Sequence, residues 1–249
     1  MTLVVNGLTV SHDGSKALSG VSAEFGKGLN VIVGPNGAGK SSLLGAIAGL
    51  VTFDGTVTLA GVGLGSDPKS ISTQVAVLSQ RPAMPVGMTV GEYVLAGRAP
   101  YLGWFGSYSS EDEAFAKRVA NELGLTHLAG RNLTELSGGQ QQLVALARCF
   151  VQDTPVLLVD EPSSHLDIAV QQEVLNRLQA AGKEKTVLCV LHDLSLAARY
   201  AEELFVMRQG RLVAAGPVKQ TLDAEMLSKV FGVDLTIGEV DGMPAVLGL

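Results

Sequence analysis

The stretch Gly34-Pro35-Asn36-Gly37-Ala38-Gly39-Lys40-Ser41 decides the expected fold of this 249-residue chain. It comes directly after the apolar run Leu29 to Val33 and before the helix-like segment Ser42 to Leu50. A strand, a glycine-rich loop and a helix in this order, with the pattern G-x-x-x-x-G-K-[ST], are typical of a loop that cradles phosphate groups. The glycines permit positive φ angles and close approach, so that successive backbone N–H groups can point at phosphate oxygens.

The residues of this loop predict a site for ATP and Mg²⁺. The helix N-terminus adds the positive end of its dipole to the N–H groups of the loop. Lys40 is expected to place a point charge on the outer phosphates, and the Ser41 hydroxyl is expected to bind Mg²⁺. Ser42, at the start of the helix, belongs to the same expected site. The competing interpretation is a chance glycine turn before a helix, which the preceding strand disfavours.

A second apolar run, Val156 to Val159, ends in the carboxylates Asp160 and Glu161. In a doubly wound sheet we expect this strand beside the phosphate strand, where ligands gather at the strand ends. Asp160, at the strand tip, suits a direct or indirect role at Mg²⁺. Glu161 can reach the water that attacks the γ-phosphate, so it is predicted to be the general base. Either acid alone would be an ordinary exposed residue at a strand end, but the pair favours hydrolysis of ATP.

Further apolar runs predict an α/β fold of the P-loop NTPase (RecA-like) class with a mostly parallel core sheet. Val75 to Leu78 and Val187 to Leu191 are nearly continuous apolar runs, as expected for parallel strands covered on both faces. Short pieces separated by glycine turns predict an N-terminal antiparallel β lobe; they are Leu3-Val4-Val5, Leu8-Thr9-Val10 and Val57-Thr58-Leu59. Helical patterning from Ser110 to Leu123, capped by Ser-Glu-Asp at its start, predicts an inserted α-helical subdomain. A helix near Leu194 to Glu203 and a strand at Leu204 to Val206 should follow.

Composition and charge disfavour several classes of protein. The chain is 47% hydrophobic and has 30 glycines, which indicates a turn-rich globular fold. Its net charge of −6 and pI near 5.2 disfavour nucleic acid as a partner. The apolar stretch Ser41 to Phe53 is shorter than the roughly 20 residues that span a bilayer, and Met1 to Val10 lacks the features of a secretory signal. A cytoplasmic location is expected, and the isolated Cys149 and Cys189 are interpreted as reduced core residues.

Leu136-Ser137-Gly138-Gly139-Gln140 opens another helix and forms a second potential anion site. One nucleotide does not need two helix N-termini so far apart, so either the chain folds this site back or a partner chain supplies it. The peptide resembles the signature of ATP-binding cassette ATPases, and the resemblance covers nearly the whole chain. It implies a head-to-tail homodimer in which Ser137 and Gly139 of one subunit meet the γ-phosphate held by Lys40 of the other. Gly138 and Gln140 belong to the same expected nucleotide site.

Three further motifs carry the resemblance. Gln80 follows an apolar strand and matches the glutamine that contacts Mg²⁺ and the attacking water; alone it would be an ordinary polar strand end. Ser164-His165-Leu166-Asp167 resembles the loop that crosses the dimer interface, and Asp167 is assigned to the nucleotide site with it. His192 follows the strand Val187 to Leu191 and matches the histidine that contacts the γ-phosphate, although a histidine at a strand end is more often structural. The resemblance thus implies catalytic roles for Gln80 and His192 beside Glu161.

The sequence departs from the family pattern at three positions. An aromatic side chain usually stacks on adenine where this chain has His12, so stacking depends on the imidazole ring. Gln141 and Leu143 stand where residues after the signature are often basic. These two departures concern contacts at the dimer interface rather than the phosphate chemistry.

The resemblance also implies what ATP hydrolysis drives. A cassette subunit of this kind would act through separate integral-membrane permease subunits. Three segments resemble bacterial importers of iron-siderophores, haem and cobalamin; they are Gly97-Arg98-Ala99-Pro100-Tyr101-Leu102-Gly103, Ser164 to Ile168 with Gln171, and Leu191 to Leu194 with Arg199 to Ala201. The expected place is the cytoplasmic face of the inner (plasma) membrane, as a peripheral subunit that a periplasmic or surface substrate-binding protein serves indirectly.

One cassette domain is expected over residues 1–249, with the catalytic core and β lobe in 1–80 and 136–249 and a helical subdomain in 81–135 that contacts the permease. Met84, Val86 and Met88 could line a groove for the permease, although core packing is the commoner role of such residues. The alternatives are the ATPase of an exporter or lipid-extracting system, or a cassette that serves chromosomes or translation. The last group typically has long coiled coils or tandem cassettes, which do not fit this sequence.

Overall fold

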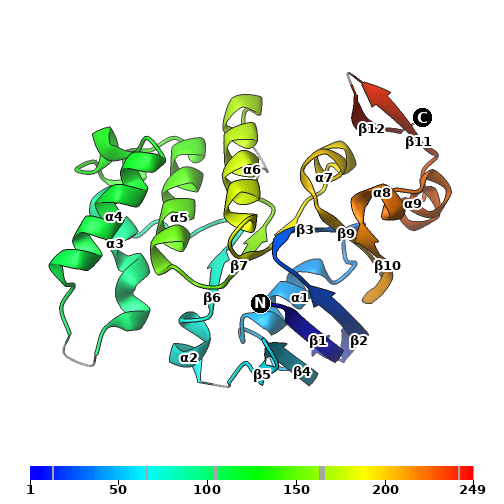
Figure 1. Cartoon of the computed structure of the whole chain (residues 1–249), viewed down its shortest axis with the longest axis horizontal. Coiled ribbons are helices and arrows are strands. Elements are labelled where there is room, and N and C mark those ends of the chain that lie inside the picture. The colour runs from blue at the N-terminus through cyan, green and yellow to red at the C-terminus, as the bar shows by residue number, and fades with distance from the viewer. Residues whose placement is uncertain (13, 66, 104–105, 163–165, 241, 249) are drawn as a thin grey trace.

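A six-stranded sheet forms the centre of the computed structural model, which describes residues 1–12, 14–65, 67–103, 106–162, 166–240 and 242–248 (Figure 1). Its strand order is β10-β9-β3-β8-β7-β6, and all neighbouring strands are parallel except β9 and β10. The strands are β3 (Gly28–Val33), β6 (Val75–Leu78), β7 (Val156–Asp160), β8 (Thr186–Val190), β9 (Glu203–Arg208) and β10 (Arg211–Pro217). The predicted α/β fold with a mostly parallel core sheet is confirmed.

Both faces of this sheet are buried, which explains why its strands are continuous apolar runs. In β3, Leu29, Val31 and Val33 belong to one hydrophobic core, whereas Ile32 belongs to a second core. Side chains alternate across a strand, so each face of the sheet needs its own cover. Helices α3 to α7 cover the first core, and α1 together with an antiparallel sheet covers the second.

The antiparallel sheet lies at the N-terminus and has the strand order β2-β1-β4-β5. Its strands are β1 (Leu3–His12), β2 (Ser15–Phe25), β4 (Asp54–Leu59) and β5 (Val62–Gly63). The expected β lobe is therefore present, but the prediction of two pieces at Leu3–Val5 and Leu8–Val10 is wrong. Both lie in β1, because Gly7, with a φ of 64°, is accommodated where the pairing of β1 with β2 shifts its register.

Strand β2 is the one large element of this sheet that the sequence pattern does not predict. Its buried apolar residues are Leu18, Val21 and Phe25, and they are separated by Ser19-Gly20 and by Ser22-Ala23-Glu24. The pairing with β1, rather than a strict alternation of apolar residues, holds β2 in the sheet.

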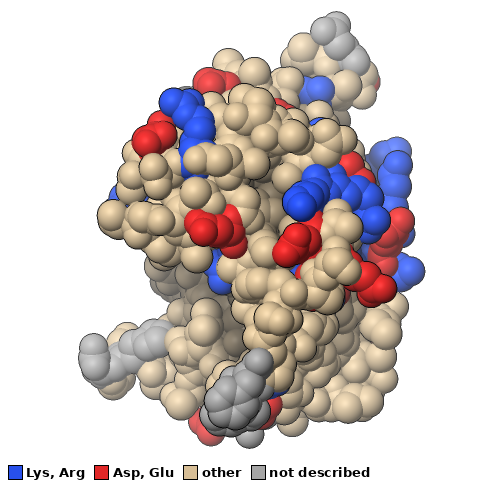
Figure 2. Space-filling view, turned by 90° about the vertical axis from the view of Figure 1, so that its left-hand side faces the viewer, with Lys and Arg blue, Asp and Glu red and all other residues tan. Residues whose placement is uncertain are grey.

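The segment between β6 and β7 is mainly helical and lies at one end of the sheet (Figure 1). It contains α3 (Val90–Leu95), η1 (Ala96–Tyr101), α4 (Ser110–Glu122), η2 (Thr126–Leu128), η3 (Leu133–Glu135) and α5 (Gly138–Gln152). Met84 and Met88 pack against the first core, whereas Val86 is 89% exposed. Acidic and basic side chains are intermixed on the surface at this end of the molecule (Figure 2).

The helix predicted from Ser110 is confirmed, but its N-cap is Ser109. The Ser109 hydroxyl accepts a hydrogen bond from the Asp112 N–H at 3.1 Å, and the Asp112 carboxylate accepts one from the Ser109 N–H at 3.0 Å. This reciprocal capping box needs the acidic side chain three residues after the cap, a position that Asp112 fills for Ser109.

The remaining helices and a C-terminal hairpin complete the chain. They are α1 (Lys40–Ile47), α2 (Pro68–Ser72), α6 (Ile168–Gly182), α7 (Leu194–Tyr200), α8 (Val218–Thr221), α9 (Ala224–Phe231), β11 (Leu235–Val240) and β12 (Met243–Gly248). The helix predicted to reach Glu203 ends at Tyr200, because Glu203 already pairs with Asn30 as the first residue of β9. The hairpin packs on α7, where the Ser195 hydroxyl bonds to both the N–H and the carbonyl of Val246.

The two cysteines lie in the core, as predicted from the sequence. Cys149 and Cys189 are buried free thiols, and burial raises the pKa of Cys149 to about 12. Within the described ranges, no helix combines the length and the apolar character needed to cross a bilayer.

The carboxylate strand β7 does not lie beside the phosphate strand β3, so that prediction is wrong. Strand β8 lies between them and pairs with β3 on one side and with β7 on the other. Crossover rules fix the hand of a parallel connection but leave its neighbour in the sheet open, so strand order cannot be deduced from sequence order. As a consequence, the end of β8 lies between the ends of β3 and β7, and His192 follows two residues after the last residue of β8, Val190.

Candidate nucleotide site

The loop that links β3 to α1 takes its shape from two crowded glycines. Gly39, just before α1, has a φ of 97°, and a Cβ there would lie 2.5 Å from the carbonyl oxygen of Ala17. A Cβ on Gly34 would lie 2.2 Å from the carbonyl oxygen of Met207. A larger residue at either position would push the loop away from its neighbouring strands. Because α1 begins at Lys40, the first N–H groups of the helix, which lack partners within it, lie next to this loop.

A pocket at the N-terminus of α1 brings most of the predicted loop residues together. It is lined by Ala17, Asn36, Gly37, Ala38, Gly39, Lys40, Ser41, Ser42 and Glu161. Gly34 and Pro35 are not among its lining residues, but their carbonyl oxygens hold Lys40. Ala17 is the lining residue that the sequence analysis missed, because it belongs to the unpredicted strand β2.

Lys40 is a buried cation at the base of this pocket, only 6% exposed. Its Nζ donates to the carbonyl oxygens of Gly34 at 2.7 Å and Pro35 at 3.1 Å. Burial lowers the pKa of Lys40, and the negative charges of Glu161 and Asp160 act in the opposite direction. A desolvated ammonium group beside a row of N–H donors is well placed to bind a phosphate oxygen.

Asp160, the last residue of β7, lies next to the start of α1, where it shares a hydrogen bond with Ser41. Burial raises its pKa, whereas a hydrogen bond with Ser41 lowers it and the neighbouring charge of Glu161 raises it further. Its Oδ1 is buried and has no hydrogen-bond partner among the described residues. A serine hydroxyl and a carboxylate with an unused oxygen are the hard oxygen ligands that Mg²⁺ prefers. Ser41 and Asp160 therefore fit a magnesium ion.

Glu161 lies where three strand ends meet. Gln80 follows β6, Glu161 follows β7 and His192 follows β8, and these strands are neighbours in the sheet. The Nε2 of Gln80 donates to the Oε2 of Glu161 at 2.6 Å, and the Nε2 of His192 contacts the Oε1 of Glu161. The three predicted catalytic residues are thus in direct contact at the carboxyl edge of the sheet, where open α/β sheets bind their ligands.

The backbone and the surroundings of Glu161 orient its carboxylate. Its φ is 49°, a left-handed conformation that is uncommon for a residue with a long side chain. The Glu161 N–H donates to the carbonyl oxygen of Val190 at 3.2 Å, which fixes the turn to β8. The Glu161 side chain is 16% exposed, whereas that of His192 is 46% exposed. Glu161 thus presents an oriented and largely shielded carboxylate to the pocket that the phosphate loop lines.

The signature residues form the N-terminus of α5. The Ser137 hydroxyl accepts a hydrogen bond from the Gln140 N–H at 3.3 Å, and the Gln140 Oε1 accepts one from the Ser137 N–H at 3.0 Å. This capping box is the local reason that the helix begins at Gly138. Ser137 and Gly138 are exposed, and the signature residues are not among those that line the phosphate pocket in the described chain. The chain does not fold its second anion site back on its own phosphate loop.

Of the two other residues predicted to bind the nucleotide, the structure describes the side chain of Asp167 but not that of His12. Asp167 caps α6, because its Oδ1 accepts a hydrogen bond from the Val170 N–H at 2.9 Å. Ser164 and His165, in the same predicted motif, lie outside the described residues. His12 is the last residue of β1, and its side chain also lies outside the described part of the structure.

The two departures after the signature are accommodated inside the chain. Leu143 is 8% exposed and belongs to the first core. The Gln141 Nε2 donates to the carbonyl oxygens of Leu133 and Leu136, both at 3.3 Å. These contacts fasten the first turn of α5 to the turn before it.

Comparison with known proteins identifies the family. The model of the ABC transporter family matches residues 18–164. The chain is 35% identical to the ferric enterobactin transport ATP-binding protein of Escherichia coli K12, over 97% of this chain and 92% of that protein. It is 37% identical to the hemin import ATP-binding protein of Rhodococcus jostii RHA1, over 99% of this chain and 86% of that protein.

A solved structure supports the same assignment. The structure of a metal-chelate type ABC transporter in an inward-facing conformation matches with a TM-score of 0.87 and 25% identity, over 100% of this chain and 97% of that one. The chain belongs to the ABC transporter family and is one of its ATP-binding ATPases.

Proposed function

We propose that this chain is the ATP-hydrolysing subunit of a bacterial ABC importer that energises uptake of a metal chelate through a separate permease. The names of the ferric enterobactin and hemin relatives, and that of a similar cobalamin import ATP-binding protein of Halobacterium salinarum, support a substrate class of iron-siderophore, haem or cobalamin. The contact of Gln80 and His192 with Glu161, next to the phosphate loop, carries the proposal of hydrolysis.

Glu161 is the proposed general base that takes a proton from the attacking water. Gln80 and His192 each hold one oxygen of its carboxylate, so the base is oriented before the reaction. Lys40 exchanges its carbonyl partners for phosphate oxygens and neutralises the charge on the γ-phosphate. When bound, Mg²⁺ further neutralises the phosphate oxygens, and Ser41, Asp160 and Gln80 are the residues that would hold it.

A second copy of the chain completes each nucleotide site in this proposal. The N-terminus of α5 is exposed, carries glycines and has the positive end of the helix dipole, which suits the γ-phosphate held by a partner. A Cβ on Gly139 would lie 3.4 Å from the side chain of Val170, so the first turn of α6 packs against the signature. Asp167, which caps α6, therefore belongs to the same surface as Ser137.

The remaining assignments concern adenine and the membrane. We place the adenine beside His12, whose imidazole would stack on the base. Residues 81–135 are the proposed subdomain that contacts the permease, and the exposed Val86 is available to such a partner. The chain would then lie at the cytoplasmic face of the inner membrane as a peripheral subunit, and a substrate-binding protein would act on it only through the permease.

Uptake by cells that carry Glu161→Gln in place of the native chain tests the proposed function. We expect an ATP-bound dimer to accumulate with the permease and the uptake of an iron-siderophore, haem or cobalamin to stop. Glu184→Gln is the matched control, because Glu184 is exposed and lies outside the phosphate pocket. Unchanged uptake of all three compounds contradicts the substrate class. Stimulation of the ATPase by nucleic acid or ribosomes, and not by a permease, contradicts the transport role.

A further inference from the structure

The segment Gly97 to Tyr101 packs on the far end of the helix that carries the signature. It forms part of η1, and η1 lies against α5. A Cβ on Gly97 would lie 2.4 Å from the carbonyl oxygen of Arg148, so the close approach of η1 to α5 requires glycine at this position. None of these residues lines the phosphate pocket in the part of the chain that the structure describes. The contacts of this segment are therefore with α5 and not with the phosphate pocket.

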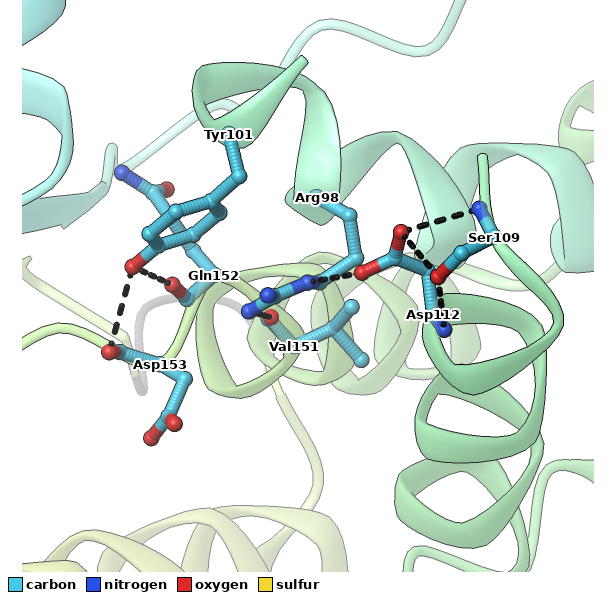
Figure 3. A network of polar contacts seen from close by, with 7 residues as sticks. All are labelled: Arg98, Tyr101, Ser109, Asp112, Val151, Gln152 and Asp153. Carbon is cyan, nitrogen blue, oxygen red and sulfur yellow. Dashed lines mark hydrogen bonds and ion pairs between the residues drawn. The ribbon is translucent and has the colours of Figure 1, made fainter. Parts of the chain in front are cut away.

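Arg98 joins the start of α4 to the end of α5 (Figure 3). Its Nε donates to the Oδ1 of Asp112 at 2.7 Å, and its Nη1 donates to the carbonyl oxygen of Val151 at 3.3 Å. Asp112 also closes the capping box of α4 with Ser109, so the same carboxylate anchors both a helix start and the arginine. The Arg98 side chain is 19% exposed and the Asp112 side chain 17% exposed. This ion pair is therefore largely shielded, and the guanidinium places a positive charge at the negative end of the α5 dipole.

Tyr101 binds the last carbonyl groups of the same helix. Its hydroxyl donates to the carbonyl oxygen of Gln152 at 2.8 Å and lies 3.3 Å from that of Asp153 (Figure 3). The Arg98 Cζ lies 4.1 Å from the centre of the Tyr101 ring, so the two side chains support one another. The Gln152 side chain in turn donates to the carbonyl oxygens of Ser72, the last residue of α2, and Val75, the first residue of β6. Arg98 and Tyr101 thus hold the C-terminus of α5 in a fixed place against the core sheet.

Helix α5 links the residues that Arg98 and Tyr101 contact to the signature. It runs from Gly138 to Gln152 and is about 22 Å long, with the signature at one end and the Arg98–Tyr101 contacts at the other. A small tilt at the C-terminus of a rigid helix displaces its N-terminus. Hydrogen bonds to a γ-phosphate tolerate displacements of only a fraction of an ångström to about 1 Å.

We propose that Arg98 and Tyr101 are positioning residues, which set the direction of α5 and so the place where Ser137 to Gly139 meet the nucleotide held by a second copy of this chain. The inference rests on the proposed function, in which the signature acts on the partner's nucleotide. Arg98 and Tyr101 therefore affect the pairing of two chains and the turnover of ATP. Binding of nucleotide by a single chain depends on its own phosphate loop and is independent of them.

The test measures ATP-driven pairing and nucleotide binding separately. Tyr101→Phe and Arg98→Lys are each placed in the Glu161→Gln background, and pairing is followed by light scattering as the ATP·Mg²⁺ and protein concentrations rise. We expect the protein concentration at half pairing to rise about threefold for Tyr101→Phe and about tenfold for Arg98→Lys, on the scale of the hydrogen bonds lost. Affinity of the unpaired chains for a fluorescent ADP analogue should stay within about twofold of the parent, since ADP has no γ-phosphate for the signature to bind.

Two control variants separate positioning from a general loss of structure. Tyr108→Phe removes a hydroxyl that has no hydrogen bond in the described structure. Arg118→Lys changes an exposed arginine that lies over the Phe115 ring and makes no hydrogen bond or ion pair with α5 among the described residues. Both should pair like the parent, and thermal unfolding of all variants reports whether they fold. Pairing of Tyr101→Phe and Arg98→Lys at the parental concentration overturns the proposal, and so does an equal loss of ADP affinity. A Glu161→Gln parent that does not pair with ATP contradicts the proposed function itself, and the parent alone reveals this outcome.

Discussion

Replacement of Lys40 by alanine tests how the phosphate loop binds nucleotide. In the structure the Lys40 ammonium is buried and donates two hydrogen bonds, to the carbonyl oxygens of Gly34 and Pro35. On binding, these donors turn to phosphate oxygens, where the hydrogen bonds join two opposite charges. Bonds of this kind contribute roughly 1.5 to 3 kcal/mol. Their loss should therefore raise the dissociation constant of ATP·Mg²⁺ by about 10- to 150-fold.

Isothermal titration of Lys40→Ala with ATP·Mg²⁺ measures this constant directly. Lys183→Ala is the matched control, because Lys183 is exposed and is absent from the residues that line the phosphate pocket in the described chain. The control should bind ATP like the native protein. Binding by Lys40→Ala within about twofold of the native chain would refute the assignment of Lys40 to the outer phosphates.

Three further predictions concern the base, the loop and a helix cap. Glu161→Gln should lower the rate of single-turnover hydrolysis by about 100- to 10,000-fold with ATP affinity nearly unchanged, and an equal loss of both would contradict a role as general base. Gly39→Ala should lower the free energy of unfolding by about 1 to 3 kcal/mol more than Gly37→Ala. Both glycines have a positive φ, but a Cβ would crowd the Ala17 carbonyl oxygen only at Gly39. Equal denaturation midpoints of the two variants would contradict this reason. Hydrogen bonds from Thr89 lower the pKa of Glu92, so the stability that Glu92 contributes at neutral pH is lost as the pH falls below 4.5 through the lowered value. Melting temperatures of Glu92→Gln and the native chain should therefore converge at low pH, and a gap that widens there would contradict the assignment.

The sequence contains enough information to predict the local parts of the site. The phosphate loop is a contiguous pattern whose glycines, lysine and serine have fixed offsets, so the sequence predicts that Lys40 and Ser41 belong to one site, and both line the same pocket. The parallel strands could be predicted because burial on both faces leaves continuous apolar runs, as in β3 and β8. The contact of Gln80 and His192 with Glu161 joins three separate strand ends, and only the resemblance to a family indicated it.

The features that escaped prediction depend on pairing between distant segments. The order β3-β8-β7 is decided by packing, and no local pattern distinguishes it from a direct pairing of β3 with β7. The continuous strand β1 depends on a register shift that absorbs Gly7, whereas local chemistry favours a turn at this glycine. The contacts of Arg98 are likewise absent from any local pattern, since its partners Asp112 and Val151 are 14 and 53 residues away in the chain.

Complementation between two inactive variants tests most directly whether two chains share each nucleotide site. Lys40→Ala disables the phosphate loop, and Gly138→Asp places a negative charge where the signature would meet the γ-phosphate. A Cβ on Gly138 meets no atom within 4 Å in the described chain, so the second variant should fold normally. In a mixed pair, the intact loop of one chain faces the intact signature of the other, so we expect the mixture to hydrolyse ATP although each variant alone does not. A mixture as inactive as its two components would contradict it.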